Sequence, residues 1–377
     1  MAVEKRIRYA VVGLGYIAQA AVLPAFVHAR SNSQLVALVS DDDVKLKRLS
    51  KKYGVSHTYS YASYEECLQS GEVDAVYIAL PNTLHREYTE KAAQAGIHVL
   101  CEKPMATSED DCVAMISACD ANRVKLMIAY RLHFEEANLS TIELLESGKL
   151  GEPRIFNSTF TQQVKEGDIR LRKETGGGTL YDIGVYCINA ARYLFRDEPE
   201  QVVAVSVKGK EKRFREVEES VSAVLRFPGD RLASFSCSFG ASDMSAYEVV
   251  GTKGSVRLDP GYELAAELKQ TVKIGEKSKT KVFPKRDQFA PELIYFSDCI
   301  LQNKEPEPSG REGLIDVKII EALYRSARTA APVTVEINPP KKRPTRSQQI
   351  TKPGVPMPKL VNASSPPRID ADLRLAH

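Results

Sequence analysis

Short apolar runs alternate with amphipathic stretches along the first 130 residues of the chain. An apolar run of four to six residues is typical of a buried strand, and apolar positions three and four apart are typical of a helix. Strands that alternate with helices pair in parallel through right-handed connections, so this region is predicted to form a doubly wound Rossmann sheet. The predicted strands are 8–12, 35–39, 75–79, 98–101 and 126–129, and the predicted helices include 44–53, 85–95 and 108–122.

From about residue 151 the apolar positions recur at every second residue. Residues 220–227 and 231–239 alternate in this way on either side of a Pro-Gly-Asp turn, a pattern that predicts a β-hairpin. Because the alternation leaves one sheet face bare, we expect a homodimer or homotetramer through that face. Further predicted strands are 153–164, 201–208, 246–250 and 255–258, and a late amphipathic helix is predicted at 313–329.

The expected fold class is therefore α/β followed by α+β. An N-terminal Rossmann doubly wound parallel sheet precedes a C-terminal open, mainly antiparallel β-sheet domain. We predict a cofactor domain at 1–130, a substrate and oligomerisation domain at 131–337, and a basic tail at 338–377. The tail has eight prolines and little periodicity, so it is expected to be mobile or to wrap over the surface.

Composition narrows the class of protein. The 377 residues are 43% hydrophobic and 27% charged, which is typical of a globular protein of about two domains. The net charge is +3, but the tail holds eight Lys and Arg against two Asp, which leaves −3 for the rest of the chain. A mildly acidic body argues against nucleic-acid binding, and the short basic run at 341–346 is expected to be solvated.

The seven cysteines are odd in number and include no Cys-x-x-Cys pair. Neither a disulfide framework nor a metal site is expected, and a cytoplasmic setting fits best. Residues 9–27 carry no charge, but Gly13, Gly15 and Pro24 interrupt them, so no membrane span is expected.

The segment Gly13-Leu-Gly-Tyr-Ile-Ala18 follows the first predicted strand and opens a helix. Glycines in this place allow a tight turn, and backbone amides can then approach a pyrophosphate at the positive end of the helix. The turn predicts dinucleotide binding; a glycine turn that binds nothing is the alternative.

The end of the second predicted strand indicates which nicotinamide cofactor is used, because the adenosine ribose binds there. Ser40 is followed by three aspartates at 41–43 and then by Lys45. A small hydroxyl and a cation suit the 2′-phosphate of NADP, whereas Asp41 would repel it, so NADP is favoured and NAD stays an alternative. The acids can also serve only to begin a helix.

Two loops follow later strands of the sheet, Leu80-Pro-Asn-Thr-Leu-His85 and Cys101-Glu-Lys-Pro104. Ligands of such sheets bind at the carboxyl ends of the strands, where both loops lie. Lys103 could therefore reach substrate and nicotinamide together, or it could be a simple loop charge.

In the second domain, three glycines at 176–178 lead into a predicted helix. Asp182 and Tyr186 are at positions i and i+4, so the helix would present them on one face, with Asn189 continuing the polar stripe. Tyr186 could instead be a core aromatic whose hydroxyl is bound to Asp182.

These segments, together with Tyr130-Arg-Leu-His133, resemble the Gfo/Idh/MocA oxidoreductases, and most closely the glucose-fructose oxidoreductase group. The resemblance covers about residues 7–335 and not the tail. It implies that Lys103 contacts the substrate hydroxyl and the nicotinamide, that the Lys103–Pro104 peptide is cis, that Tyr186 is the acid/base, and that Asp182 helps to hold the sugar. The cofactor-binding residues expected are Gly13, Gly15, Tyr16, Ile17, Ser40, Lys45, Leu80, Pro81, Asn82, His85, Glu102, Lys103 and Arg131.

The function expected is that of an NADP-dependent sugar oxidoreductase, which converts an aldose to its lactone, a ketose to its polyol, or both. A lysine ammonium near the phenol would stabilise its ionised form and so make it a better base. The alternatives are an exchange-type dehydrogenase or reductase of another sugar or diol, such as xylose, anhydrofructose or a dihydrodiol, and a non-catalytic sugar sensor.

Overall fold

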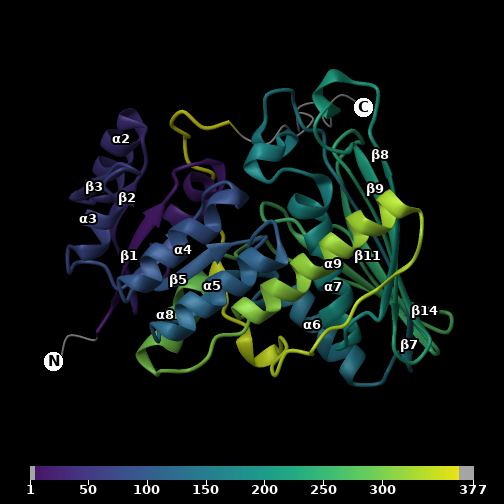
Figure 1. Ribbon diagram of the computed structural model, residues 1–377. Coiled ribbons are helices and arrows are strands. Elements are labelled where there is room, and N and C mark those ends of the chain that lie inside the picture. The colour runs from purple at the N-terminus through teal and green to yellow at the C-terminus, as the bar shows by residue number, and fades with distance from the viewer. Residues whose placement is uncertain (1–4, 365–377) are drawn as a thin grey trace, which may run out of the picture. The chain divides into compact units, whose positions relative to one another are not determined.

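The computed structural model describes residues 5–364 of the chain (Figure 1). Over that range the chain forms two compact units. The first contains residues 5–134, 286–314 and 350–364, and the second contains residues 135–285 and 315–349. Each unit thus contains segments from the C-terminal third of the chain. The two units therefore differ from the predicted domains 1–130, 131–337 and 338–377, which are continuous segments.

The first unit is built on a six-stranded, fully parallel sheet of order β3-β2-β1-β4-β5-β6. This order confirms the predicted Rossmann sheet, and it places the end of β1 at the point where the strand order reverses. The strands are β1 Ile7–Val12, β2 Ser33–Val39, β3 His57–Tyr59, β4 Ala75–Ile78, β5 His98–Glu102 and β6 Leu126–Ala129.

Helix ends in this unit follow the capping residues of the sequence. Asp42 caps α2 by accepting a hydrogen bond from the Lys45 amide at 3.0 Å, and Gly54 ends it in a left-handed conformation. Ser108 caps α5 in the same way. The helices are α1 Leu23–Ala25, α2 Asp43–Tyr53, α3 Tyr64–Gln69, α4 His85–Gln94, α5 Glu109–Ala121 and α8 Ala290–Leu301.

Helix α8, which the sequence pattern did not predict, packs on the first sheet. The hydroxyl of Ser297 is 2.8 Å from the hydroxyls of both Tyr9 on β1 and Ser33 on β2. All three side chains are buried, so these hydrogen bonds satisfy polar groups that would otherwise destabilise the core. This packing explains why residues 286–314 belong to the first unit.

The second unit is built on a nine-stranded sheet of order β14-β13-β12-β11-β7-β10-β9-β8-β16. Only β7 and β10 pair in parallel, so the predicted mainly antiparallel sheet is confirmed. The predicted hairpin is β9–β10, whereas β13 and β14 were not predicted. The strands are β7 Pro153–Thr161, β8 Gln201–Val207, β9 Ser220–Phe227, β10 Arg231–Ser238, β11 Met244–Gly251, β12 Gly254–Leu258, β13 Leu268–Ile274, β14 Lys277–Phe283 and β16 Val333–Thr334.

The helices of this unit are α6 Glu136–Glu146, α7 Val185–Phe195 and the part of α9 Gly310–Thr329 that follows residue 314. A fully buried cation on α7, Arg192, ties this helix to α9. Its Nε lies 2.5 Å from Glu198 and its Nη1 lies 2.6 Å from Asp316 on α9. A buried guanidinium needs such acceptors because its charge is otherwise costly to desolvate.

The tail contacts both units as far as residue 364. Within the second unit, Arg343 donates to Glu198 at 2.8 Å and Arg346 donates to the Glu136 carbonyl at 3.0 Å. Within the first, β17 Lys352–Pro353 pairs with β15 Arg286–Asp287. The described tail therefore wraps over the surface, and its predicted continuation at 365–377 lies outside the described residues.

All seven cysteines are buried and unbridged. Across residues 5–364, no group of three or more His, Cys, Asp or Glu side chains is arranged to hold a metal ion. Within the same range, no helix has the length and apolar character needed to cross a membrane.

Candidate functional site

The turn after β1 depends on glycine. Gly13 has φ of +91°, and an added Cβ would lie 2.4 Å from the carbonyl oxygen of Ala79, so no other residue fits. Its amide donates to the Val39 carbonyl at 3.0 Å, which fixes the turn between the ends of β2 and β4. Beside Gly15, by contrast, an added Cβ would meet nothing within 4 Å. A tight turn with open space beside it fits a dinucleotide pyrophosphate.

The helix that follows this turn begins as a π-helix, Ala18–Val22, before α1 continues it. Such segments are rare and occur frequently at functional sites. The predicted residues Tyr16 and Ile17 are half-buried just before it. Gln19 is 1% exposed and donates to the Leu14 carbonyl at 2.9 Å, which ties the π-helix to the glycine turn.

The predicted 2′-phosphate residues lie together at the end of β2. The Ser40 hydroxyl accepts from the Asp42 amide at 3.2 Å, and the Lys45 ammonium lies 3.8 Å from the Asp42 carboxylate. Asp41 accepts from the Tyr61 amide at 2.7 Å. The alternative interpretation of the acid run thus holds for Asp42, which caps α2, while phosphate binding by Ser40 and Lys45 stays a prediction.

His85 connects the two loops that were predicted to face the cofactor. Its Nε2 is 3.0 Å from the Leu80 carbonyl and its Nδ1 is 3.0 Å from the Pro104 carbonyl. Burial lowers the pKa of His85, and the hydrogen bonds to the backbone carbonyls oppose this change. The ring is fully buried and holds both loops through these hydrogen bonds. Its predicted contact with the cofactor stays a prediction. The Lys103–Pro104 peptide is cis, as the resemblance implied.

Glu102, beside Lys103, is buried. It accepts from the Tyr77 hydroxyl at 2.8 Å and from the Lys103 amide at 3.3 Å. Burial raises the pKa of this carboxyl, and the charge of Lys103 acts in the opposite direction. Arg131 is also buried and donates to the side chain of Gln288, so this predicted cofactor residue is held from the α8 side of the unit.

No motif or spacing in the sequence pointed to Glu292, a fully buried acid in the first turn of α8. Neither of its carboxylate oxygens has a hydrogen-bond partner among the described residues. Burial raises the pKa of Glu292 well above its usual range, the negative charge of Glu102 adds to this, and Arg131 opposes it. The surroundings of Glu292 therefore favour the protonated, neutral form of its carboxyl over the charged form.

In the second unit, Asp182 lies in another π-helix, Leu180–Gly184, which leads into α7. The i, i+4 spacing predicted for Asp182 and Tyr186 assumed an α-helix, and that assumption is wrong for this turn because the π-helix inserts an extra residue. The Asp182 carboxylate accepts from Arg170 Nε at 2.8 Å and from Gln162 Nε2 at 2.9 Å.

Tyr186 is half-buried and its ring contacts those of Phe160 and Tyr262, with centroids 5.5 Å and 5.9 Å apart. Asn189, which was expected to continue the polar stripe, donates to Asp316 in the core at 2.9 Å. The roles of Asp182 and Tyr186 stay predictions, and the Asp182 carboxylate is held by two further side chains, Arg170 and Gln162. These two were missed because they lie in loop and strand-end positions without a recognisable motif.

The glycine run is held by one carboxylate. Gly178 has φ of +133°, and the next residue, Thr179, donates from its amide and its hydroxyl to Glu218 at 2.7 Å each. Tyr324 donates to the same carboxylate oxygen at 2.8 Å. This anchor fixes the start of the π-helix that carries Asp182.

A parallel sheet whose first turn fits a pyrophosphate, followed by an open mixed sheet, defines a class of two-domain oxidoreductases that use a nicotinamide nucleotide. The chain belongs to the Gfo/Idh/MocA oxidoreductase family. Residues 7–130 match the family's NAD-binding Rossmann domain, and residues 139–257 match a C-terminal domain of the same family.

Several relatives act on sugars. The chain is 32% identical over 350 residues to the D-xylose 1-dehydrogenase [NADP(+)] of Haloarcula marismortui, with 89% of this chain and 95% of the relative covered. The crystal structure of an aldose-aldose oxidoreductase from Caulobacter crescentus, solved with glycerol, has 38% identity and a TM-score of 0.84 over 88% of this chain and all of that one. A 3-ketoreductase from Actinomadura kijaniata, solved with NADP and TDP-benzene, has 27% identity and a TM-score of 0.79 over 85% and 98% of the two chains.

The raised pKa of Glu292 predicts a pH-dependent stability. Above about pH 4.5 the unfolded chain releases this proton while the folded protein keeps it, so the carboxyl destabilises the fold increasingly as pH rises toward its raised pKa. Glu292→Gln removes this term. We expect the free energy of unfolding of the variant, relative to that of the parent, to rise from pH 5 to pH 8, by about 1.4 kcal/mol for each pH unit below the raised pKa.

Urea unfolding at both pH values measures the difference. Glu66→Gln, an exposed acid on α3, is the matched control and should change neither value. Destabilisation of equal size by Glu292→Gln at both pH values would show that the carboxyl is ionised and paired.

Proposed function

We propose that the chain is an NADP-dependent oxidoreductase that transfers a hydride between a sugar carbinol or carbonyl carbon and the nicotinamide. The carrying observation is the group around Asp182, a carboxylate held by Arg170 and Gln162, with the Tyr186 hydroxyl two residues beyond its π-helix. A sugar needs polar groups for its hydroxyls and an apolar surface for its C–H faces, and the rings beside Tyr186 supply the second.

The cofactor proposal rests on the first unit. The turn at Gly13 fits a pyrophosphate, and Ser40 with Lys45 offers a hydroxyl and a cation where the 2′-phosphate of NADP would lie. The names of the xylose dehydrogenase and of the solved ketoreductase complex support the same choice. NAD stays the alternative because Asp41 and Asp42 lie nearby.

The bound nicotinamide would supply the hydride chemistry. Among the chain's own residues, Tyr186 would take the proton of the sugar hydroxyl during oxidation and return it during reduction. Lys103 would stabilise the ionised phenol and contact the substrate hydroxyl. Asp182 would hold a neighbouring sugar hydroxyl, which its bonds to Arg170 and Gln162 orient.

Two modes of turnover fit these residues. In the glucose-fructose oxidoreductase mode, one bound cofactor is reduced by an aldose and reoxidised by a second sugar, and the aldose-aldose relative supports it. In the exchange mode, the cofactor leaves after each turnover, and the xylose dehydrogenase supports that. A sugar sensor without catalysis is the third candidate, and it is weakened by the presence of Lys103, Asp182 and Tyr186 together.

A first experiment separates the three. The protein is purified without added nucleotide and its nicotinamide absorbance and fluorescence are recorded, first alone and then with xylose, glucose and finally fructose. We expect NADP, carried in or added, to be reduced by at least one aldose. Reoxidation of carried-in cofactor by a second sugar identifies the coupled mode, whereas binding without turnover across a broad aldose and ketose panel contradicts the enzyme proposal.

The catalytic assignment predicts that Tyr186→Phe lowers kcat by about 10²- to 10⁴-fold, because the ring is kept and only the proton-transferring hydroxyl is lost. Lys103→Met should have a similar effect. NADP affinity, measured by fluorescence titration, should stay within about threefold for Tyr186→Phe. Tyr181→Phe removes a hydroxyl one helical turn away and is the control, and turnover of Tyr186→Phe equal to that of this control contradicts the assignment.

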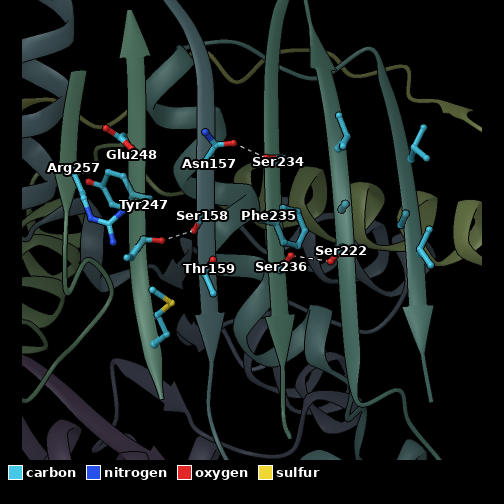
Figure 2. Close-up of a pocket in the computed structure, with 17 residues that line it drawn as sticks. Asn157, Ser158, Thr159, Ser222, Ser234, Phe235, Ser236, Tyr247, Glu248 and Arg257 are labelled. Carbon is cyan, nitrogen blue, oxygen red and sulfur yellow. Dashed lines mark hydrogen bonds between the residues drawn. The ribbon is translucent and has the colours of Figure 1, made fainter. Parts of the chain in front are cut away.

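The outer face of the second sheet is proposed to bind a second copy of this chain. Figure 2 shows a shallow hollow on this face, lined by residues such as Asn157, Ser222 and Ser236. The hydroxyls of Ser222 and Ser236 are 2.8 Å apart, so these polar groups already satisfy each other. Around them the face exposes apolar side chains: Ile155, Val203, Val205, Val207, Val224, Leu232 and Met244.

Charge on this face favours self-association. Glu248 on β11 pairs in register with Arg257 on β12, so the face carries both signs side by side. A two-fold axis can then bring each charge of one copy against the opposite charge of the other. The hollow lies on the opposite face of β7 from Phe160 and hence from Tyr186, because neighbouring side chains of a strand alternate.

Light scattering tests the interface. The parent should be dimeric or larger, and Val205→Asp with Val224→Asp should give a monomer, because two buried charges would face their symmetry copies. Val113→Asp, an equally exposed valine on α5, should leave the mass unchanged. A monomeric parent, or a double variant of unchanged mass, contradicts the proposal.

A further inference from the structure

Residues 350–364 of the tail belong to the first unit and contact the two turns that begin the Rossmann sheet. At one end, β17 pairs with β15, where Lys352 faces Asp287 and Pro353 faces Arg286. Farther along, Val361 and Asn362 reach the turns after β1 and β2. The segment is therefore fixed at both ends on this unit.

The first of these contacts is a reciprocal pair of hydrogen bonds. The Val361 amide donates to Gln19 Oε1 at 2.8 Å, and Gln19 Nε2 donates back to the Val361 carbonyl at 2.8 Å. The same Nε2 donates to the carbonyl of Leu14, within the glycine turn. Because Gln19 is almost fully buried, this amide links the tail backbone directly to the turn that fits the pyrophosphate.

The second contact is made at the end of β2. The Asn362 amide lies 3.0 Å and 3.3 Å from the two carboxylate oxygens of Asp42. The Lys45 amide and the Asn362 side chain lower the pKa of Asp42 below its usual range. Asn362 has φ of +46°, a left-handed conformation that asparagine tolerates better than most residues, and this turn directs its side chain at Asp42.

These two contacts are made beside the two places where a dinucleotide meets such a sheet: at the π-helix that follows the glycine turn, and at the ribose position after β2. A bound nucleotide would span the same two turns. The backbone amide of Asp42 donates to the Ser40 hydroxyl, and its carboxylate lies 3.8 Å from the Lys45 ammonium. Asn362 therefore binds the residue that contacts both predicted 2′-phosphate residues.

We propose that residues 350–364 form a clamp that joins the turns after β1 and β2 and so slows release of the bound nucleotide. This inference rests on the proposed NADP function. Asn362 of the clamp acts as a positioning residue, together with Gln19 and Asp42, which the clamp binds. Holding the two turns at a fixed separation pre-organises the site and reduces the ordering that binding would otherwise require.

The test measures how fast NADPH leaves the full-length protein. Enzyme loaded with NADPH is mixed with excess NADP⁺ in a stopped-flow instrument, and the loss of bound-nicotinamide fluorescence gives the dissociation rate. Asn362→Asp keeps the left-handed backbone but sets a carboxylate against Asp42. We expect its dissociation rate to rise about tenfold, the effect of losing one hydrogen bond to a charged group.

A second variant ends the chain after Gly354 and should release NADPH at least as fast as Asn362→Asp. Asn303→Asp, the same change at an exposed position after α8, is the control and should match the parent. Thermal unfolding without nucleotide accompanies each rate. For Asn362→Asp we expect a midpoint of thermal unfolding close to that of the parent, with a faster NADPH release. A tail with a purely structural role would give the opposite pattern, a lower midpoint and an unchanged release rate.

The outcomes are distinct. NADPH release within twofold of the parent in both variants overturns the clamp and leaves the NADP-dependent function standing. Slower release in the variants would show that the tail obstructs the site, and this too overturns the clamp. If the parent binds neither NADP⁺ nor NADPH, the proposed function fails and the clamp fails with it.

Discussion

The approach of Gly13 to the carbonyl of Ala79 is the constraint on which the first unit depends. A Cβ at this position would lie 2.4 Å from the carbonyl oxygen, so the chain can turn here only without a side chain. The contact fixes the end of β1 against the end of β4, and the hydrogen bond to Val39 fixes it against β2. The positions of the glycine turn, the loop that begins at Leu80 and the end of β2 are therefore all fixed relative to Gly13.

Three buried side chains of this unit are polar groups whose charged forms are disfavoured by burial. His85 bonds to the carbonyls of two loops and burial lowers its pKa, whereas burial raises the pKa values of Glu102 and Glu292. Such groups tolerate a low dielectric without a full desolvation penalty.

Sequence patterning was sufficient where burial is strong and regular. The five predicted strands of the first sheet and the hairpin β9–β10 are apolar enough to show their period, and the glycine turn and the Lys103 loop have motifs. The pattern missed β3, which is only three residues long, and β13–β14, whose lysine-rich strands are largely exposed. It also missed Glu292 and Arg170, because long-range packing sets a side chain's surroundings and no local spacing encodes that.

Both π-helical segments, Ala18–Val22 and Leu180–Gly184, directly follow glycine-rich turns and carry or adjoin predicted functional residues. A π-helical turn is an α-helix that has absorbed one extra residue, and each residue corresponds to about 100° of rotation about the axis. Gain or loss of a single codon at either place would therefore redirect the adjoining side chains without disturbing the sheet beneath. The side chains beside the glycine turn and those before α7 could therefore be reoriented in evolution independently of one another.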